Sequence, residues 1–280
     1  MTRESETRFL IVTSAASSTR DLAWLQRHIP SDARAVAFDA TSSYAVLGLM
    51  GPRSRELLSQ LTDTDVSNDA FPFATSQVID LAYARVRASR ITYVGELGWE
   101  LYIPTEFAQG VFDAIAETGA SAELALAGYH AMNSLRMEKG YRHWGHDITD
   151  EDTPLDAGLG FAVASNKKAP FIGRDALLRQ REKGLRRRLV QAALTESNAL
   201  LYHNEPIWRD GELVGRITSG MFGHTVGRPL GMGYIECASG LADADFVRGG
   251  RYEIEVAGER LAAEVQLRGF YDPNNLRVKT

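Results

Sequence analysis

Cysteine is almost absent from this sequence: Cys237 is the only one among 280 residues. A single thiol excludes an internal disulfide framework, and it cannot supply the several thiolates of a Cys-based zinc site or an iron–sulfur cluster. Proteins that rely on disulfides belong to oxidising compartments, so this composition favours a reducing one. We therefore expect a cytoplasmic location.

Long apolar runs and long basic runs are also missing. No apolar stretch approaches the roughly 20 residues that a membrane helix requires, and residues 1–6 lack the apolar core of a signal peptide. The net charge is −5, and the one basic cluster, at residues 186–188, is too short for a nucleic-acid surface. No glycine pattern matches a nucleotide-phosphate loop. We expect neither nucleic acid nor a membrane among the partners.

The first two thirds of the chain mix helical and extended patterns, as in α+β folds. We expect Thr105 to cap the helix that follows it, and Pro52 to open a helix with an apolar stripe of three leucines. Apolar spacing predicts helices over residues 18–28, 105–117, 129–139 and 173–183. It predicts strands over residues 8–13, 44–49, 78–81, 84–93 and 99–103.

The pattern changes at about Gly184, beyond which short β runs alternate with turn signals. Asp210-Gly211 is the sequence of a type I′ turn at a hairpin tip. Strands are predicted over residues 188–194, 207–214 (a hairpin), 216–219, 231–235, 252–256 and 262–267. This spacing predicts a small antiparallel barrel or sandwich, and we expect domains over residues 1–183 and 184–280.

The run from Arg90 to Tyr102 carries the strongest functional signal. An extended stretch enters a Gly-Glu-Leu-Gly turn, and Glu100 then follows Trp99 among apolar neighbours. A carboxylate in such surroundings needs a hydrogen-bond donor, and a flat heterocycle rich in N–H groups is one. The alternative is an ordinary hairpin with Glu100 on its solvent-facing side, because short motifs are weak by themselves.

A second dense stretch follows the helix that Gly140 is expected to end. His143, His146 and Asp147 lie within five residues and could suggest a metal, but they match no standard zinc spacing. A hydrogen-bonded structural loop is the favoured interpretation, and we predict no metal site.

Together these stretches resemble the aminomethyltransferase family, whose founding member is the glycine cleavage T-protein. Residues 93–100 match its Tyr-x-Gly-Glu-x-Gly-x-Glu pattern, and residues 144–147 match its aromatic-Gly-His/Asn-Asp/Glu element. Four later segments of the chain also resemble family segments: residues 153–159 (Thr-Pro-Leu-Asp-Ala-Gly-Leu), 171–177 (Phe-Ile-Gly-Arg-Asp-Ala-Leu), 215–220 (Gly-Arg-Ile-Thr-Ser-Gly) and 270–273 (Phe-Tyr-Asp-Pro). Order and spacing agree over nearly the whole chain.

The resemblance implies a folate-binding α+β domain followed by a C-terminal antiparallel β-barrel. It implies one-carbon transfer to tetrahydrofolate from a methylated-amine-derived substrate. Glu100 would accept hydrogen bonds from the pterin ring, and Tyr93 would position that ring. Arg136 and Trp144 would line or support the cavity, and Arg277 would reach the substrate tail. No catalytic residue can be assigned.

Details of the resemblance favour one branch of the family. Residues 138–147 are similar to the folate-binding half of sarcosine and dimethylglycine dehydrogenases, and Met132 stands where T-proteins generally carry an arginine. A related iron–sulfur repair family has a cysteine after Lys-Gly, where this chain has Tyr141, which disfavours that family.

Family members also carry an earlier Gly-Gly…Asp-Asp segment, one aspartate of which lies by the reacting folate nitrogen. The sequence shows no such segment and no flavin domain, so we expect an incomplete N-terminal folate layer and no FAD site. An FAD-dependent oxidoreductase domain or subunit is the expected partner. The alternative to a transferase is a non-catalytic folate-binding or partner-docking module.

Overall fold

The computed structural model describes residues 1–196 and 199–280, which form two compact units. The first unit comprises Met1–Thr92, Glu96–Leu126 and Arg277–Thr280, and the second comprises Tyr93–Gly95 and Ala127–Leu276. The first unit contains β1 (Thr2–Arg3), β2 (Phe9–Leu10), α1 (Ser18–Arg27), β3 (Tyr44–Met50), α2 (Ser54–Ser59), β4 (Ser76–Leu81), β5 (Ala84–Ser89), β6 (Gly98–Pro104) and α3 (Ala108–Gly119). The second contains α4 (Tyr129–Lys139), α5 (Arg174–Lys183), β7 (Arg187–Leu194), β8 (Pro206–Arg209), β9 (Glu212–Gly223), β10 (Arg228–Glu236), α6 (Ala244–Gly249), β11 (Tyr252–Val256) and β12 (Glu259–Gln266).

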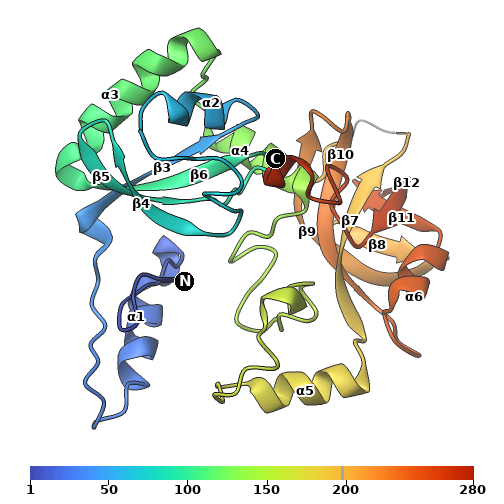
Figure 1. Cartoon of the computed structure of the whole chain (residues 1–280). Helices are drawn as coiled ribbons and strands as arrows, with labels where there is room; N and C mark the ends of the chain where they lie inside the picture. The colour runs from blue at the N-terminus through green and yellow to red at the C-terminus, as the bar shows by residue number, and fades with distance from the viewer. Residues whose placement is uncertain (197–198) are drawn as a thin grey trace. The chain divides into compact units, whose positions relative to one another are not determined.

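The first unit is built on a four-stranded antiparallel sheet in the order β3-β6-β5-β4. Helices α2 and α3 pack on one face of this sheet (Figure 1). In β6, the side chains of Trp99, Leu101 and Ile103 are each 0% exposed and join the core with the helices. Since side chains alternate along a strand, Glu100 and Tyr102 lie on the opposite face.

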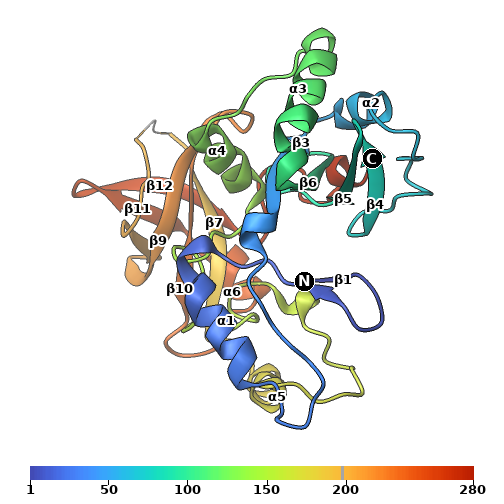
Figure 2. The ribbon, with the colours of Figure 1, turned by 90° about the vertical axis from the view of Figure 1, so that its left-hand side faces the viewer.

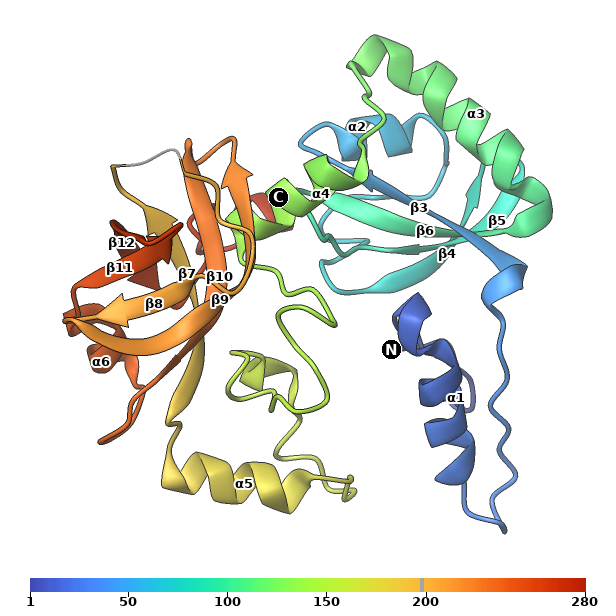
Figure 3. The ribbon, with the colours of Figure 1, turned by 180° about the vertical axis from the view of Figure 1, so that it is seen from behind.

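The second unit contains a closed six-stranded antiparallel barrel in the order β10-β7-β12-β11-β8-β9 (Figure 3). Helix α4 packs against β9 and β10 (Figure 2). At the β8–β9 tip, Asp210 and Gly211 have φ angles of 52° and 89°, the two positive values that a type I′ turn requires. The predicted α+β fold with a C-terminal antiparallel barrel is confirmed.

Two strands are shorter than the sequence predicts. The strand expected over residues 8–13 is wrong in extent, because only β2 forms a ladder, with β1, and residues 11–12 are exposed. The strand expected over residues 84–93 ends at Ser89. There the N–H of Ile91 donates back to the Ser89 carbonyl and closes a tight turn that leaves the sheet.

Two helices begin later than expected. The prediction that Thr105 caps the following helix is wrong, because its hydroxyl donates to the carbonyl of Ser42 and α3 begins only at Ala108. Pro52 lies in the turn before α2 rather than in its first helical turn. The predicted apolar stripe of that helix does enter the core, with Leu57 and Leu58 buried.

Helix α6 was not expected from the sequence. The Asp243 carboxylate caps it by accepting hydrogen bonds from the N–H groups of Asp245 and Phe246. The helix is only six residues long, so its apolar spacing is too short to be recognised as periodic. None of the helices in the described part of the chain combines the length and apolar character needed to span a membrane.

Candidate functional site

Glu100 lies in the middle of β6, half-buried on the sheet face that points away from the helices. It stands opposite Gly48 in β3 and Ser89 in β5, so its neighbour on one side has no side chain. The hydroxyl of Tyr102 donates to Oε2 of Glu100 at 2.6 Å. The hydrogen-bond donor that Glu100 needs in its apolar surroundings is therefore Tyr102, two positions further along the same strand.

Tyr93 and Gly95 belong to the second unit. The Tyr93 hydroxyl donates to the carbonyl oxygen of Arg142 at 3.1 Å, and its ring stacks on that of Tyr141 with centroids 6.2 Å apart. Burial raises the pKa of Tyr93, so the hydroxyl stays protonated at neutral pH. Gly95 has a φ of 79°, and a Cβ there would come within 3.0 Å of the Lys139 side chain. The glycine thus allows residues 93–95 to lie against the end of α4.

The last turn of α4 places two buried charges against the barrel. Glu138 is 1% exposed, and its Oε1 accepts from the N–H groups of Thr225 at 2.6 Å and Val226 at 2.8 Å. The Lys139 ammonium donates to Oδ2 of Asp272 at 2.8 Å. A buried charge must be satisfied by partners of this kind. The two residues therefore fix the helix end to the β9–β10 turn and to the segment after β12.

Arg136 binds the carboxylate of Asp147, which lies in the stretch predicted to be a hydrogen-bonded loop. Asp147 is 0% exposed, and its Oδ2 accepts from Nη1 of Arg136 at 2.6 Å and from the N–H of His143 at 2.9 Å. Its Oδ1 accepts from the hydroxyl of Thr218 at 2.6 Å. Its carbonyl accepts from the Tyr234 hydroxyl at 3.0 Å. Asp147 is therefore the centre of a hydrogen-bonded loop, as the favoured interpretation of this stretch predicts.

The loop that Asp147 holds presents aromatic side chains at the surface. Trp144 is 41% exposed, and the rings of His143 and His146 stack with centroids 4.7 Å apart. Burial, then the neighbouring His146 and Arg136, lower the pKa of His143. An exposed indole beside two stacked imidazole rings offers flat surfaces on which a planar ring can stack.

Arg277 lies in the first unit, in a short helical turn near the end of the chain. Its side chain is 59% exposed, and Nη1 is 4.0 Å from Oε1 of Glu96. Of the five expected site residues, the second unit contains Tyr93, Arg136 and Trp144, and the first contains Glu100 and Arg277. The sequence missed Tyr102 and Thr218. The signal for Tyr102 was its spacing of two from Glu100 in a strand.

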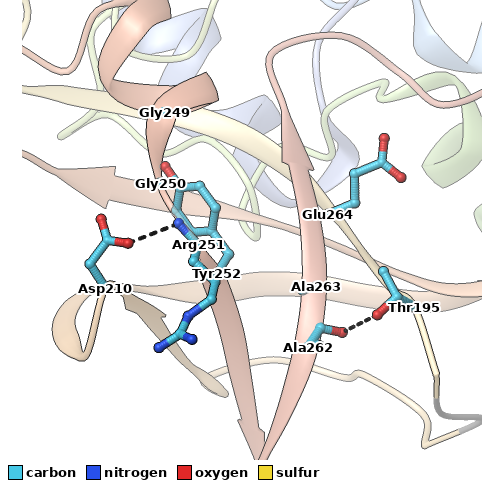
Figure 4. A pocket seen from close by; sticks show the side chains of 9 residues that line it. All are labelled: Thr195, Asp210, Gly249, Gly250, Arg251, Tyr252, Ala262, Ala263 and Glu264. Carbon is cyan, nitrogen blue, oxygen red and sulfur yellow. Dashed lines mark hydrogen bonds between the residues drawn. The ribbon is translucent and has the colours of Figure 1, made fainter.

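A separate hollow of about 630 Å³ lies on the barrel (Figure 4). At its edges the Asp210 carboxylate accepts from the N–H of Arg251 at 3.0 Å, and the Thr195 hydroxyl donates to the carbonyl of Ala262 at 3.2 Å. Nine described residues form its wall, and none of the five expected site residues is among them.

Comparison with known proteins supports the architecture and the motifs. The chain matches the GCVT N-terminal domain over residues 1–167 and the glycine cleavage T-protein C-terminal barrel domain over residues 187–272. Mitochondrial sarcosine dehydrogenase of Mus musculus is 43% identical over 247 residues, which are 88% of this chain and 27% of that protein. The aminomethyltransferase of Listeria monocytogenes serotype 4a is 34% identical over 269 residues, which are 96% of this chain and 70% of that protein.

A solved structure agrees with these matches. The glycine cleavage system aminomethyltransferase T from Bartonella henselae has a TM-score of 0.74 and 26% identity, and the match covers 92% of this chain and 67% of that one. The chain thus spans about a quarter of the dehydrogenase and two thirds of the transferases. Since both domain models match in order and the Listeria protein is covered over most of its length, this chain belongs to the glycine cleavage T-protein, or aminomethyltransferase, family.

Proposed function

We propose that this chain binds tetrahydrofolate and serves in one-carbon transfer to it, as the folate part of a sarcosine or dimethylglycine dehydrogenase-like system. The observation that carries the proposal is the half-buried carboxylate of Glu100, the last residue of the motif over residues 93–100. The hydroxyl of Tyr102 holds this carboxylate by a hydrogen bond. Family membership supports the general chemistry, and the identity to sarcosine dehydrogenase supports the branch.

The chemistry of Glu100 fits the pterin edge. A carboxylate only accepts hydrogen bonds, and its two oxygens offer about four lone-pair sites. Tyr102 uses one of these sites on Oε2. The remaining sites can take the paired N–H groups of a pterin, and hydrogen bonds to a charged group contribute about 1.5–3 kcal/mol each.

The other expected residues have roles that their contacts support. Tyr93 lies against Tyr141 and would position the pterin ring. Arg136 is 2% exposed and paired with Asp147. It would therefore support the proposed folate cavity by holding the loop that carries Trp144. The exposed cation of Arg277 would reach an anionic substrate tail.

The work assigned to this chain is orientation and charge stabilisation. Holding two reactants in place removes much of the entropic barrier, and fixed carboxylates stabilise a developing cation. Tetrahydrofolate, when bound, supplies the nitrogen that receives the one-carbon unit. The donor would be a methylated-amine-derived substrate delivered by an FAD-dependent oxidoreductase domain or subunit, and the location would be cytoplasmic.

The test is calorimetric titration of the chain with tetrahydrofolate under anaerobic conditions. Glu100→Gln should weaken binding at least about tenfold, because it removes the charge that strengthens the pterin bonds, and should leave the melting temperature nearly unchanged. Glu106→Gln is the matched control, since Glu106 is an exposed acid just after β6. Equal affinity of the Glu100 variant and the unsubstituted chain would refute the assignment.

Single-turnover transfer assays then separate the proposed transferase from the non-catalytic alternative. Transfer to tetrahydrofolate from a supplied amine donor should be near background for the chain alone, because no general acid/base is assigned in it. It should rise when a partner flavoprotein or the family's N-terminal Gly-Gly…Asp-Asp segment is added. Folate binding with no transfer under either condition would favour a folate-binding or partner-docking module.

A further inference from the structure

The buried Asp147 carboxylate joins three segments of the second unit. Its Oδ2 receives hydrogen bonds from Arg136 in α4 and from the main chain of His143 in the loop, and its Oδ1 receives one from Thr218 in β9. Because the carboxylate is 0% exposed, these protein donors stand in for water. The position of the loop over residues 142–148 therefore depends on each of them.

Thr218 occupies an irregular place in its strand. Ser219 lies opposite Met232 of β10, whereas Ile217 lies opposite Gly233. The step from Met232 to Gly233 in β10 therefore faces a step of two residues in β9, and Thr218 is the extra residue of a β-bulge. A bulge bends a strand and redirects a side chain, and bulges are common beside functional sites. Here the redirected hydroxyl reaches Asp147.

The Thr218 hydroxyl has two acceptors within reach but only one proton. Oδ1 of Asp147 is 2.6 Å away, and the carbonyl oxygen of Met232 is 3.0 Å away. The shorter contact, to the charged oxygen, is the stronger one. Replacing Thr218 by valine would keep the branched shape and leave one carboxylate oxygen buried without its donor.

We propose that Thr218 is a positioning residue for the ligand-contacting loop. Its hydroxyl fixes the Asp147 carboxylate, and the carboxylate fixes the main chain at His143 and hence the placement of Trp144. The tetrahydrofolate measurement below rests on the proposed function, whereas the hydrogen-exchange measurement does not.

Three variants test the inference: Thr218→Val, Thr218→Ser and, as a matched control, Thr195→Val. Thr195 is the exposed residue that follows β7, and its hydroxyl donates to a main-chain carbonyl. Loss of a buried bond should speed amide exchange over residues 143–148 roughly tenfold in Thr218→Val. Tetrahydrofolate affinity should fall about fivefold in the same variant. Thr218→Ser should restore both, and Thr195→Val should change neither.

The outcomes separate this inference from the proposed function. Unchanged exchange of the loop in Thr218→Val, or no restoration by serine, would overturn the positioning role. A lower melting temperature with full affinity in the folded protein would show that Thr218 is only structural, which also overturns it. If the unsubstituted chain does not bind tetrahydrofolate, the proposed function fails, and the exchange of the loop still decides the role of Thr218.

Discussion

The hydroxyl of Tyr102 donates to Oε2 of Glu100 at 2.6 Å, on the face of the sheet that points away from the core. Burial, and then the hydrogen bond to Glu100, raise the pKa of Tyr102. The phenol therefore keeps its proton throughout the neutral range and remains a donor. A partner that stays protonated in the neutral range holds the carboxylate in one orientation, and such pre-organisation reduces the entropy lost when a ligand binds.

Removing this donor should weaken ligand binding less than removing the charge. We expect Tyr102→Phe to lower tetrahydrofolate affinity about threefold to tenfold, since one hydrogen bond contributes about 0.5–1.5 kcal/mol. Calorimetry on Tyr102→Phe, Glu100→Gln and the double variant should show less than additive losses. Tyr83→Phe, at a fully exposed turn, serves as the control. Additive losses would contradict the coupling between the two residues.

Breaking the buried pair of Lys139 and Asp272 should strongly destabilise the second unit. Their side chains are 3% and 6% exposed and 2.8 Å apart. We expect Asp272→Asn to lower the free energy of unfolding by about 3 kcal/mol, because it leaves a buried ammonium without its counter-charge. Denaturant titration measures the change. Asp245→Asn, in an exposed pair with Arg248, should change stability by less than about 0.5 kcal/mol, and an equal effect of both variants would argue against the buried pair.

Acidification should destabilise the fold through His143. Burial, followed by His146 and Arg136, lowers the pKa of His143 in the folded chain. As the pH falls below about 6.5, the unfolded chain takes up the proton first, so stability is complete above that pH and declines toward the folded pKa. The loss of unfolding free energy between about pH 7.5 and pH 5.5 should be smaller in His143→Gln. The exposed control His203→Gln should behave like the unsubstituted chain, and the same loss in all three proteins would exclude this contribution.

Replacing glycine by alanine should change the stability of the fold in opposite directions at Gly211 and Gly110. Gly211 has a φ of 89° at the hairpin tip, and an L side chain there costs about 1–2 kcal/mol. Gly110 lies inside α3, where a Cβ would meet nothing within 4 Å, so alanine there should add about 0.5–1 kcal/mol. Thermal unfolding should show a lower melting temperature for Gly211→Ala and a higher one for Gly110→Ala. Shifts of the same sign would contradict the turn assignment.

The sequence by itself determined the elements whose signals are local. The period of apolar residues placed α4 at Tyr129–Lys139, and Asp-Gly placed the tip of the β8–β9 hairpin. The motif of residues 93–100 and the order of the later motifs identified the family. Turn conformation and helix periodicity depend on residues that are close in sequence, so the local sequence was sufficient to predict these elements.

The tertiary structure decided which partner each buried polar group has. The sequence predicts that Asp147 belongs to a hydrogen-bonded loop, but it does not name the partners, because Arg136 and Thr218 lie 11 and 71 residues away. Arg90 looked like part of a strand, but it is 1% exposed and donates to the carbonyl of Phe71. A buried charge binds whichever donor or acceptor the packed chain brings within reach, and that choice is made by contacts between distant segments, which no local period encodes.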